Sequence, residues 1–110
     1  MNETLAKLGK IGLIPVIKLD SPAEALPLGK ALVAGGLPVA EVTFRTEAAE
    51  ESIRILANEL PELVLGAGTV LTTTQADAAA AAGARFKGRR QLEYAEEIGL
   101  GSAKYELISI

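Results

Sequence analysis

Short apolar runs alternate with helical patterns along most of this chain. Residues 13–17 form an unbroken apolar run, which predicts a strand with both faces buried, and residues 39–45 and 63–65 predict two more strands. A fourth strand is expected at 84–86 and a last one over 104–110. Because helical patterns separate the first four strands, the chain predicts successive βα units, which require a parallel sheet with right-handed crossovers.

Two of the predicted helices begin with capping signals. Ser21 is followed three residues later by Glu24, and Thr72 is followed three residues later by Gln75. In such a capping box, the cap hydroxyl accepts a hydrogen bond from the backbone of the third residue, whose side chain accepts one from the cap backbone in return. We therefore expect one helix to begin just after Ser21 and another just after Thr72.

Another helix is predicted between the second and third strands, with Thr46 as its N-cap. Its apolar positions recur at the spacing of a single buried stripe: Ala49, Ile53, Leu56, Ala57 and Leu60. Short helices are also expected before residue 13 and over residues 91–98. The whole pattern predicts an α/β fold with a parallel sheet of about five strands.

Composition narrows the possible chemistry. The 110 residues match the usual size of one domain, so residues 1–110 are expected to form a single α/β domain. Hydrophobic residues make up 49% of the chain, which is enough for a buried core. The absence of cysteine excludes disulfides and thiolate chemistry, and the absence of histidine removes the usual proton shuttle at neutral pH. Metal ligands would have to be carboxylates alone, and we expect no metal and no cofactor.

Charge and hydropathy bear on the partners. The net charge of −3 gives no general attraction to nucleic acid, and the one basic cluster, at 87–90, is too short to change this expectation. No apolar run approaches the roughly 18 residues needed to span a bilayer, and no signal peptide is visible. We expect a cytoplasmic protein with neither a nucleic-acid nor a membrane partner.

Candidate functional groups lie where the second and third strands end. Glu41, Thr43 and Arg45 alternate with apolar residues, so their side chains share one face of the second strand. Residues 66–69 (Gly-Ala-Gly-Thr) end the third strand. The carboxyl ends of parallel strands are where α/β proteins bind ligands, so we expect these groups to form a site. The alternative interpretation is a structural ion pair between Glu41 and Arg45.

These two segments, within residues 14–86, resemble the class I aldolases that cleave 2-keto-3-deoxy-6-phosphogluconate (KDPG) and 4-hydroxy-2-oxoglutarate (KHG). The resemblance implies a (β/α)8 barrel in which Glu41 takes part in proton transfer. The substrate-binding residues that it implies are Arg45, Thr69, Gly66 and Gly68. Taken alone, Gly66 and Gly68 are also what a tight strand-to-helix turn requires.

The same resemblance implies a lysine that forms a Schiff base on the sixth strand of the barrel, with phosphate-binding loops later still. Both lie beyond the resembling segment, and residues 87–110, a helix and a strand, diverge from the family pattern. We therefore expect residues 1–86 to be the aldolase-like βα units of an N-terminal half, without native lyase activity. Lys18, at the end of the first strand, is the best candidate for a substitute amine.

Several alternatives stay open at the level of sequence. The strands can form half of a barrel, or an open flavodoxin-like sheet of order 2-1-3-4-5 with the second strand at the edge. The chain can be an engineered or recombined α/β scaffold with no catalytic function, or an enzyme whose site is rebuilt by oligomerisation. A half-barrel has two open sheet edges, so we expect self-association through them. Binding of a small 2-keto acid or another anion is expected to be weak at best.

Overall fold

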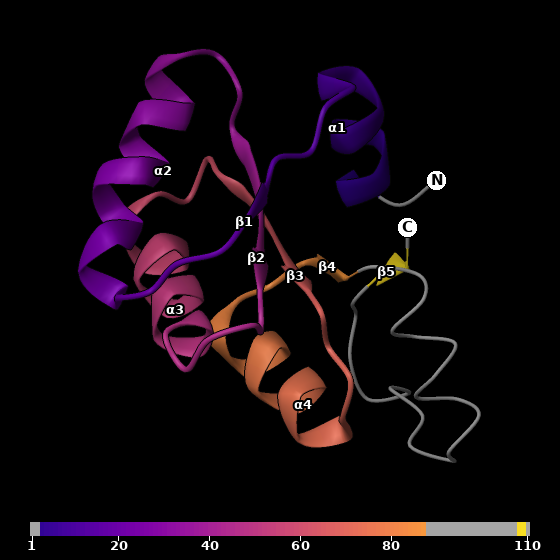
Figure 1. Cartoon of the computed structure of the whole chain (residues 1–110). Helices are drawn as coiled ribbons and strands as arrows, with labels where there is room; N and C mark the ends of the chain where they lie inside the picture. The colour runs from indigo at the N-terminus through magenta and orange to yellow at the C-terminus, as the bar shows by residue number, and fades with distance from the viewer. Residues whose placement is uncertain (1–2, 88–107, 110) are drawn as a thin grey trace.

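The computed structural model describes residues 3–87 and 108–109 of the chain, in which helices and strands alternate (Figure 1). The elements in chain order are α1 (Glu3–Ile11), β1 (Val16–Ile17), the 3-10 helix η1 (Pro22–Glu24), α2 (Ala25–Ala34), β2 (Val39–Thr43), α3 (Ala49–Glu59), β3 (Val64–Gly68), α4 (Thr73–Ala82), β4 (Phe86–Lys87) and β5 (Ile108–Ser109). The predicted helix at 91–98 lies outside the described residues, whereas β5 falls within the predicted last strand. No helix in the described part of the chain is long and apolar enough to cross a membrane.

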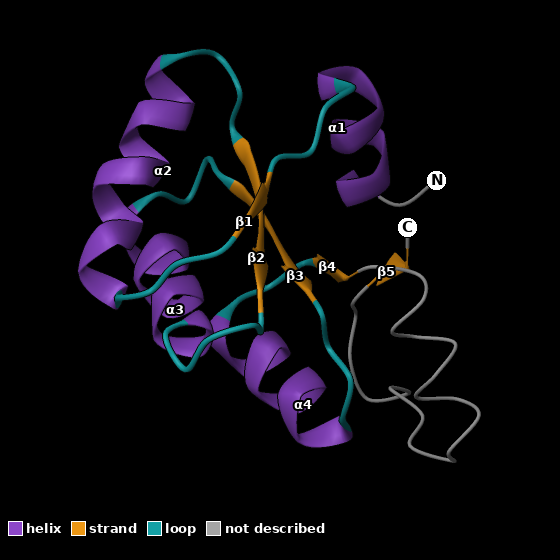
Figure 2. Ribbon diagram, viewed as in Figure 1, coloured by secondary structure: helices purple, strands orange, loops and turns teal. Residues whose placement is uncertain are grey.

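The strands form one parallel sheet in the order β1-β2-β3-β4-β5 (Figure 2). This order corrects the flavodoxin-like alternative, because β2 lies between β1 and β3 rather than at the edge. When each right-handed crossover adds the next strand on the same side, the crossover helices all fall on one face of the sheet. Helices α2, α3 and α4 do share one face, which is the arrangement of half a (β/α)8 barrel.

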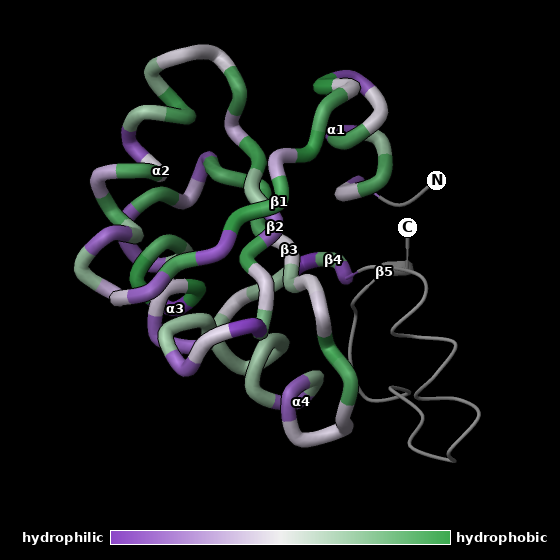
Figure 3. The backbone as a smooth tube through the Cα atoms, viewed as in Figure 1, coloured by the Kyte–Doolittle hydropathy of each residue, from purple (hydrophilic) through white to green (hydrophobic). Residues whose placement is uncertain are grey.

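The sheet has two different faces. The helix-covered face consists of Ile17, Ala40, Val42, Leu65 and Ala67, which pack with residues of α2, α3 and α4. The opposite face, which we call the Glu41 face, consists of Val16, Val39, Glu41, Thr43, Val64, Gly66, Gly68 and Phe86. Hydrophobic residues predominate along β1 and β2 (Figure 3). On the Glu41 face, Leu8 of α1 packs with the apolar residues nearest the start of the strands, so the polar groups lie toward the strand ends.

The predicted capping boxes are present, one of them in modified form. Ser21 and Glu24 make both reciprocal hydrogen bonds, although the helical turn that they open is the 3-10 helix η1, which precedes α2. Thr72 accepts from the backbone N–H of Gln75, as predicted. The Gln75 side chain instead accepts from the backbone N–H of Leu71, one residue before the cap. Local polar signals therefore located both helix starts correctly.

The apolar stripe of α3 is confirmed, but its predicted N-cap is wrong. Ala49, Ile53 and Leu56 are buried along the helix, and Leu60 is buried just beyond its end. The helix begins at Ala49, and Thr46 lies too early to cap it. The Thr46 hydroxyl donates to the backbone carbonyl of Leu19 and so ties the β2–α3 turn to the loop after β1.

We expect Gly83→Ala to lower the free energy of unfolding by about 2 kcal/mol, measured by urea denaturation. Gly83 ends α4 with a φ of +119°, and a Cβ there would lie 2.6 Å from the Cβ of Ala57. Gly9→Ala in α1 is the control, because no atom lies within 4 Å of its added Cβ, and it should stabilise the chain by up to about 1 kcal/mol. Equal stability of both variants would contradict the described packing of α4 on α3.

Candidate functional site

A half-buried carboxyl group, that of Glu41, lies at the middle of β2. The Glu41 side chain leans over β3, where its Oε2 atom lies 2.6 Å from the position that a Cβ on Gly68 would occupy. Burial raises the pKa of the Glu41 carboxyl above its usual value. Enzymes often use carboxyl groups whose pKa is raised by burial as general acids or bases, so Glu41 is the candidate proton-transferring group of this site.

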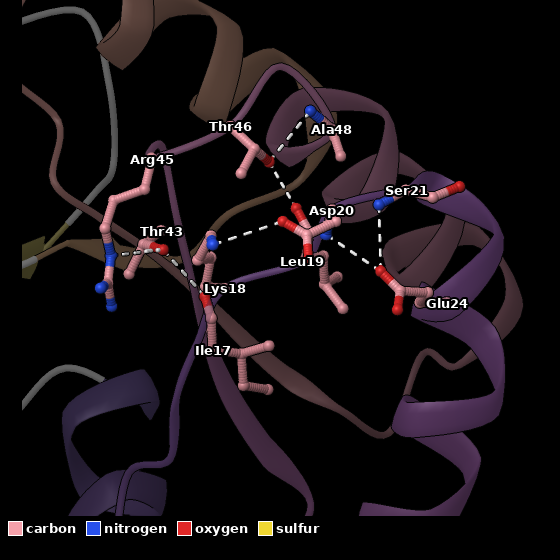
Figure 4. A network of polar contacts seen from close by, with 10 residues as sticks. All are labelled: Ile17, Lys18, Leu19, Asp20, Ser21, Glu24, Thr43, Arg45, Thr46 and Ala48. Carbon is pink, nitrogen blue, oxygen red and sulfur yellow. Dashed lines mark hydrogen bonds and ion pairs between the residues drawn. The ribbon is translucent and has the colours of Figure 1, made fainter.

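The predicted alternative of a Glu41–Arg45 ion pair does not form. Arg45 lies past the end of β2 and is exposed, and its Nε donates to the Thr43 hydroxyl over 3.2 Å. Thr43 donates in turn to the backbone carbonyl of Ile17 over 2.9 Å, which joins β2 to β1 (Figure 4). The Arg45 guanidinium group therefore lies exposed beside the C-terminal end of β2, whereas the Glu41 carboxyl group is half-buried within the sheet.

The proposed substitute amine lies at the same end of the sheet. Lys18 follows β1, and its Nζ is 3.4 Å from Oδ1 of Asp20 (Figure 4). Both side chains are more than half exposed. The backbone N–H of Asp20 donates to the Glu24 carboxylate, which orders the loop before α2. The Lys18 amine is therefore exposed and ion-paired, whereas a nucleophilic lysine is usually enclosed in a desolvated pocket or set beside another cation.

Gly66 and Gly68 lie inside β3, so the interpretation of them as turn glycines is wrong. Their register partners on β2 are Glu41 and Thr43. A Cβ on Gly66 would lie 2.2 Å from ring carbons of Phe86, so each glycine makes room for a side chain from a neighbouring strand. The glycines are needed for close packing on the Glu41 face rather than for a reversal of the chain.

Thr69 follows directly after β3 with a φ of +55°. In the described part of the chain it is the only non-glycine residue with a positive φ. This conformation costs a β-branched residue roughly 1–2 kcal/mol, and such strain concentrates at functional sites. Thr69 is thus held at the same strand end as Arg45, in an unusual backbone conformation.

Phe86 is the residue that sequence reasoning missed. It was predicted only as part of the fourth strand, yet it is fully buried on the Glu41 face next to Gly66. A possible signal was a pair of strand glycines followed, one βα unit later, by one of the few aromatic residues of the chain. That pattern indicates an aromatic ring seated over a glycine of the neighbouring strand.

An open groove of about 510 Å³ lies between the β2–α3 turn and α4. Its lining residues are Phe44, Arg45, Thr46, Glu47, Glu50, Thr74, Gln75 and Ala78. Glu41 does not line this groove, so we place the candidate site on the Glu41 face, where the half-buried carboxyl group lies. Within residues 3–87 and 108–109, no group of three or more acidic side chains is gathered as a metal site would require.

Comparison with protein families matches residues 4–89 to the model "KDPG and KHG aldolase". The 2-dehydro-3-deoxy-phosphogluconate aldolase of Treponema pallidum is 48% identical over 79 residues, which are 72% of this chain and 38% of that protein. The KHG/KDPG aldolase of Escherichia coli K12 is 50% identical over 74 residues, which are 67% of this chain and 35% of that protein. The chain therefore spans well under half the length of the curated relatives that it matches.

Solved structures show the same similarity. The 2-keto-3-deoxy-6-phosphogluconate aldolase of Zymomonas mobilis ZM4 with 3-phosphoglycerate superposes with a TM-score of 0.76 at 35% identity, over 99% of this chain and 52% of that one. The KDPG aldolase of Legionella pneumophila with pyruvate captured as a covalent carbinolamine intermediate gives 0.71 at 40% identity, over 88% and 46%. The fold is thus similar to about half of each enzyme.

Proposed function

The chain belongs to the KDPG and KHG aldolase family, and on this premise we propose that it supplies the proton-transferring half of an aldolase site. Glu41 is the proton-transferring group, and the 110 residues by themselves do not cleave a 2-keto acid. The observation that carries the proposal is the half-buried carboxyl group with a raised pKa, held beside Gly68 at the carboxyl end of the sheet.

Aldol cleavage needs a group that can both accept and donate a proton. The bond between the hydroxyl-bearing carbon and the carbon next to the keto group breaks, and the hydroxyl proton leaves as the aldehyde forms. The freed carbon then takes up a proton to become the methyl group of pyruvate. A single carboxyl group with a raised pKa can perform both transfers, first as carboxylate and then as acid.

The cleavage also needs an electron sink, which a lysine amine provides by condensing with the keto group. The carbinolamine captured in the Legionella enzyme is a covalent adduct of this kind. Lys18 follows β1 at the same end of the sheet as Arg45, but its amine is exposed and ion-paired with Asp20 rather than desolvated. Lys87 is buried and aligned with Ala67 of the helix-covered face. The amine is therefore supplied by a segment other than residues 3–87.

Arg45 and Thr69 are the proposed contacts for the substrate. Arg45 presents an exposed cation at the mouth of the site, and Thr69 follows β3 at the same end. Both Gly66 and Gly68 are engaged in the strand, so their backbone groups do not form an anion-binding turn. A small 2-keto acid consequently binds this half-site only weakly, in the millimolar range, where about 4 kcal/mol of binding free energy is available.

The first test measures cleavage by the 110-residue chain. Pyruvate release from KDPG, followed with lactate dehydrogenase, is expected to stay at the uncatalysed background. Borohydride reduction in the presence of pyruvate, followed by mass spectrometry, should likewise leave every lysine unmodified. A reduced pyruvate adduct on Lys18 would contradict the proposal and would make the isolated chain an enzyme in its own right.

A second test joins this chain to the part of a relative that it does not span. We expect a hybrid of residues 1–86 with the C-terminal remainder of the Escherichia coli aldolase to release pyruvate from KDPG. Glu41→Gln should lower that rate by at least about 100-fold, because general acid–base catalysis is worth about 10²–10⁴ in rate. Glu47→Gln, at an exposed carboxylate six residues later, is the matched control and should leave the rate unchanged. A fully active Glu41→Gln hybrid would favour the alternative of a scaffold without a catalytic role.

We also propose that the isolated chain self-associates through the free edge of β1. The carbonyl oxygens of Pro15 and Ile17 accept hydrogen bonds from β2 residues, so they face β2. The backbone N–H and C=O groups of successive residues in a strand point to opposite sides. Those of Val16 therefore face the edge, where the described residues supply no further strand. The missing N–H of Pro15 falls on the β2 side and does not protect this edge.

A further inference from the structure

Two glycines on β3 make room for two different side chains on the Glu41 face. A Cβ on Gly66 would lie 2.2 Å from the Phe86 ring, and one on Gly68 would lie 2.6 Å from Oε2 of Glu41. Residues two apart on a strand point to the same face. The aromatic ring and the carboxyl group therefore lie next to each other on β3, one over each glycine.

The Phe86 ring is fixed in this position. Its side chain is completely buried, and it packs with Leu8 of α1, Val39 of β2 and Val64 of β3. These partners all lie toward the N-terminal ends of the strands. The ring consequently separates the Glu41 carboxyl group from the N-terminal end of the sheet. Helix α1 packs over the same end.

We propose that Phe86 is a positioning residue for Glu41. Its apolar ring excludes water from the side of the Glu41 carboxyl group that faces the N-terminal ends of the strands. Gly66 is required because any larger residue would displace this ring. The inference rests on the proposed role of Glu41 in proton transfer and adds to it the part of the fold that sets the environment of that group.

None of the charged groups around Glu41 competes with burial as the main influence on the pKa of its carboxyl group. Lys18, which follows β1, is ion-paired and exposed. Arg45, just past the end of β2, is exposed and hydrogen-bonded to the Thr43 hydroxyl, and on β3 the facing residues are uncharged. On β4, Lys87 belongs to the opposite face. The charged residues of α1 are exposed: Glu3, Lys7 and Lys10. Desolvation is accordingly the cause of the raised pKa of Glu41.

The test is a carbon-13 NMR titration of the Glu41 carboxyl in the 110-residue chain, assigned with Glu41→Gln. In the wild type, the pKa of Glu41 should lie above the ordinary value for glutamate. In Phe86→Leu and Phe86→Met, water should reach the carboxylate and the pKa should fall toward that ordinary value. Leu65→Val, which shortens a buried side chain on the helix-covered face of β3, is the control and should leave the pKa of Glu41 unchanged.

Three results would overturn the inference. One is an ordinary Glu41 pKa in the wild type, and another is an unchanged pKa in whichever Phe86 variants fold. The third is an equal fall in Leu65→Val, which would indicate general loosening of the core. Because the titration needs no substrate, it is independent of the lyase tests. If the hybrid is inactive but the pKa of Glu41 changes in the Phe86 variants, only the proposed function is contradicted. If the hybrid is active but the pKa of Glu41 does not change in the Phe86 variants, only the role of Phe86 is contradicted.

Discussion

Gly66→Ala is expected to lower the free energy of unfolding by about 3 kcal/mol or more, because the added methyl group would overlap the Phe86 ring. Neither group can move away. Gly66 is paired with strands on both sides, and Phe86 is completely buried. A domain of this size has only about 5–15 kcal/mol of net stability, so the variant should unfold at a clearly lower urea concentration.

Gly68→Ala is the matched comparison for this prediction. Its added Cβ would be too close to the end of the flexible Glu41 side chain, and it would lie 3.2 Å from Cγ2 of Thr43, a tight contact that needs a shift of only a few tenths of an ångström. The carboxyl group can swing aside, so stability should change by no more than about 1 kcal/mol. The displaced carboxyl group should nevertheless lower pyruvate release by the hybrid enzyme. If both variants lost the same stability, the Phe86 ring would not be seated over Gly66 as described.

Much of the fold could be predicted because its signals are local. The capping pair Ser21 and Glu24 was predicted from its spacing, and so was the hydrogen bond from Gln75 to Thr72. The buried stripe of α3 and the parallel βα pattern were also predicted correctly. These features depend on residues three or four positions apart, or on the order of elements along the chain. Neither local spacing nor the order of elements depends on which residues pack together in the folded chain.

The errors all involve partners that are distant in sequence. Thr46 was predicted as a helix cap, but its hydroxyl bonds to Leu19 across the neighbouring loop. Gly66 was also interpreted as a residue of a tight strand-to-helix turn, whereas its close neighbour is Phe86 on the next strand. The strand order was likewise left open between two topologies. Register and order are properties of the assembled sheet, and a single sequence does not reveal them directly.

The same reasoning applies to the free edge of β1. Natural sheet proteins protect exposed edges with charges, prolines or bulges. Here Pro15 faces β2, and Lys18 lies beyond the strand and is ion-paired. Val16, on the edge strand itself, keeps 58% of its surface exposed. The edge therefore combines unpaired backbone groups with an apolar side chain, which is the pattern that favours pairing with a second copy.

Val16→Lys is accordingly expected to convert an associating chain into a monomer. A charge at this position leaves the folded chain intact, because the side chain is exposed, but it must be desolvated when a second strand pairs alongside. Sedimentation equilibrium should show a dimer or larger species for the wild type and a monomer for the variant. Leu71→Lys, at a similarly exposed apolar residue between β3 and α4, should associate like the wild type. A monomeric wild type would contradict pairing at the β1 edge, and it would also exclude a site rebuilt from two copies of this chain.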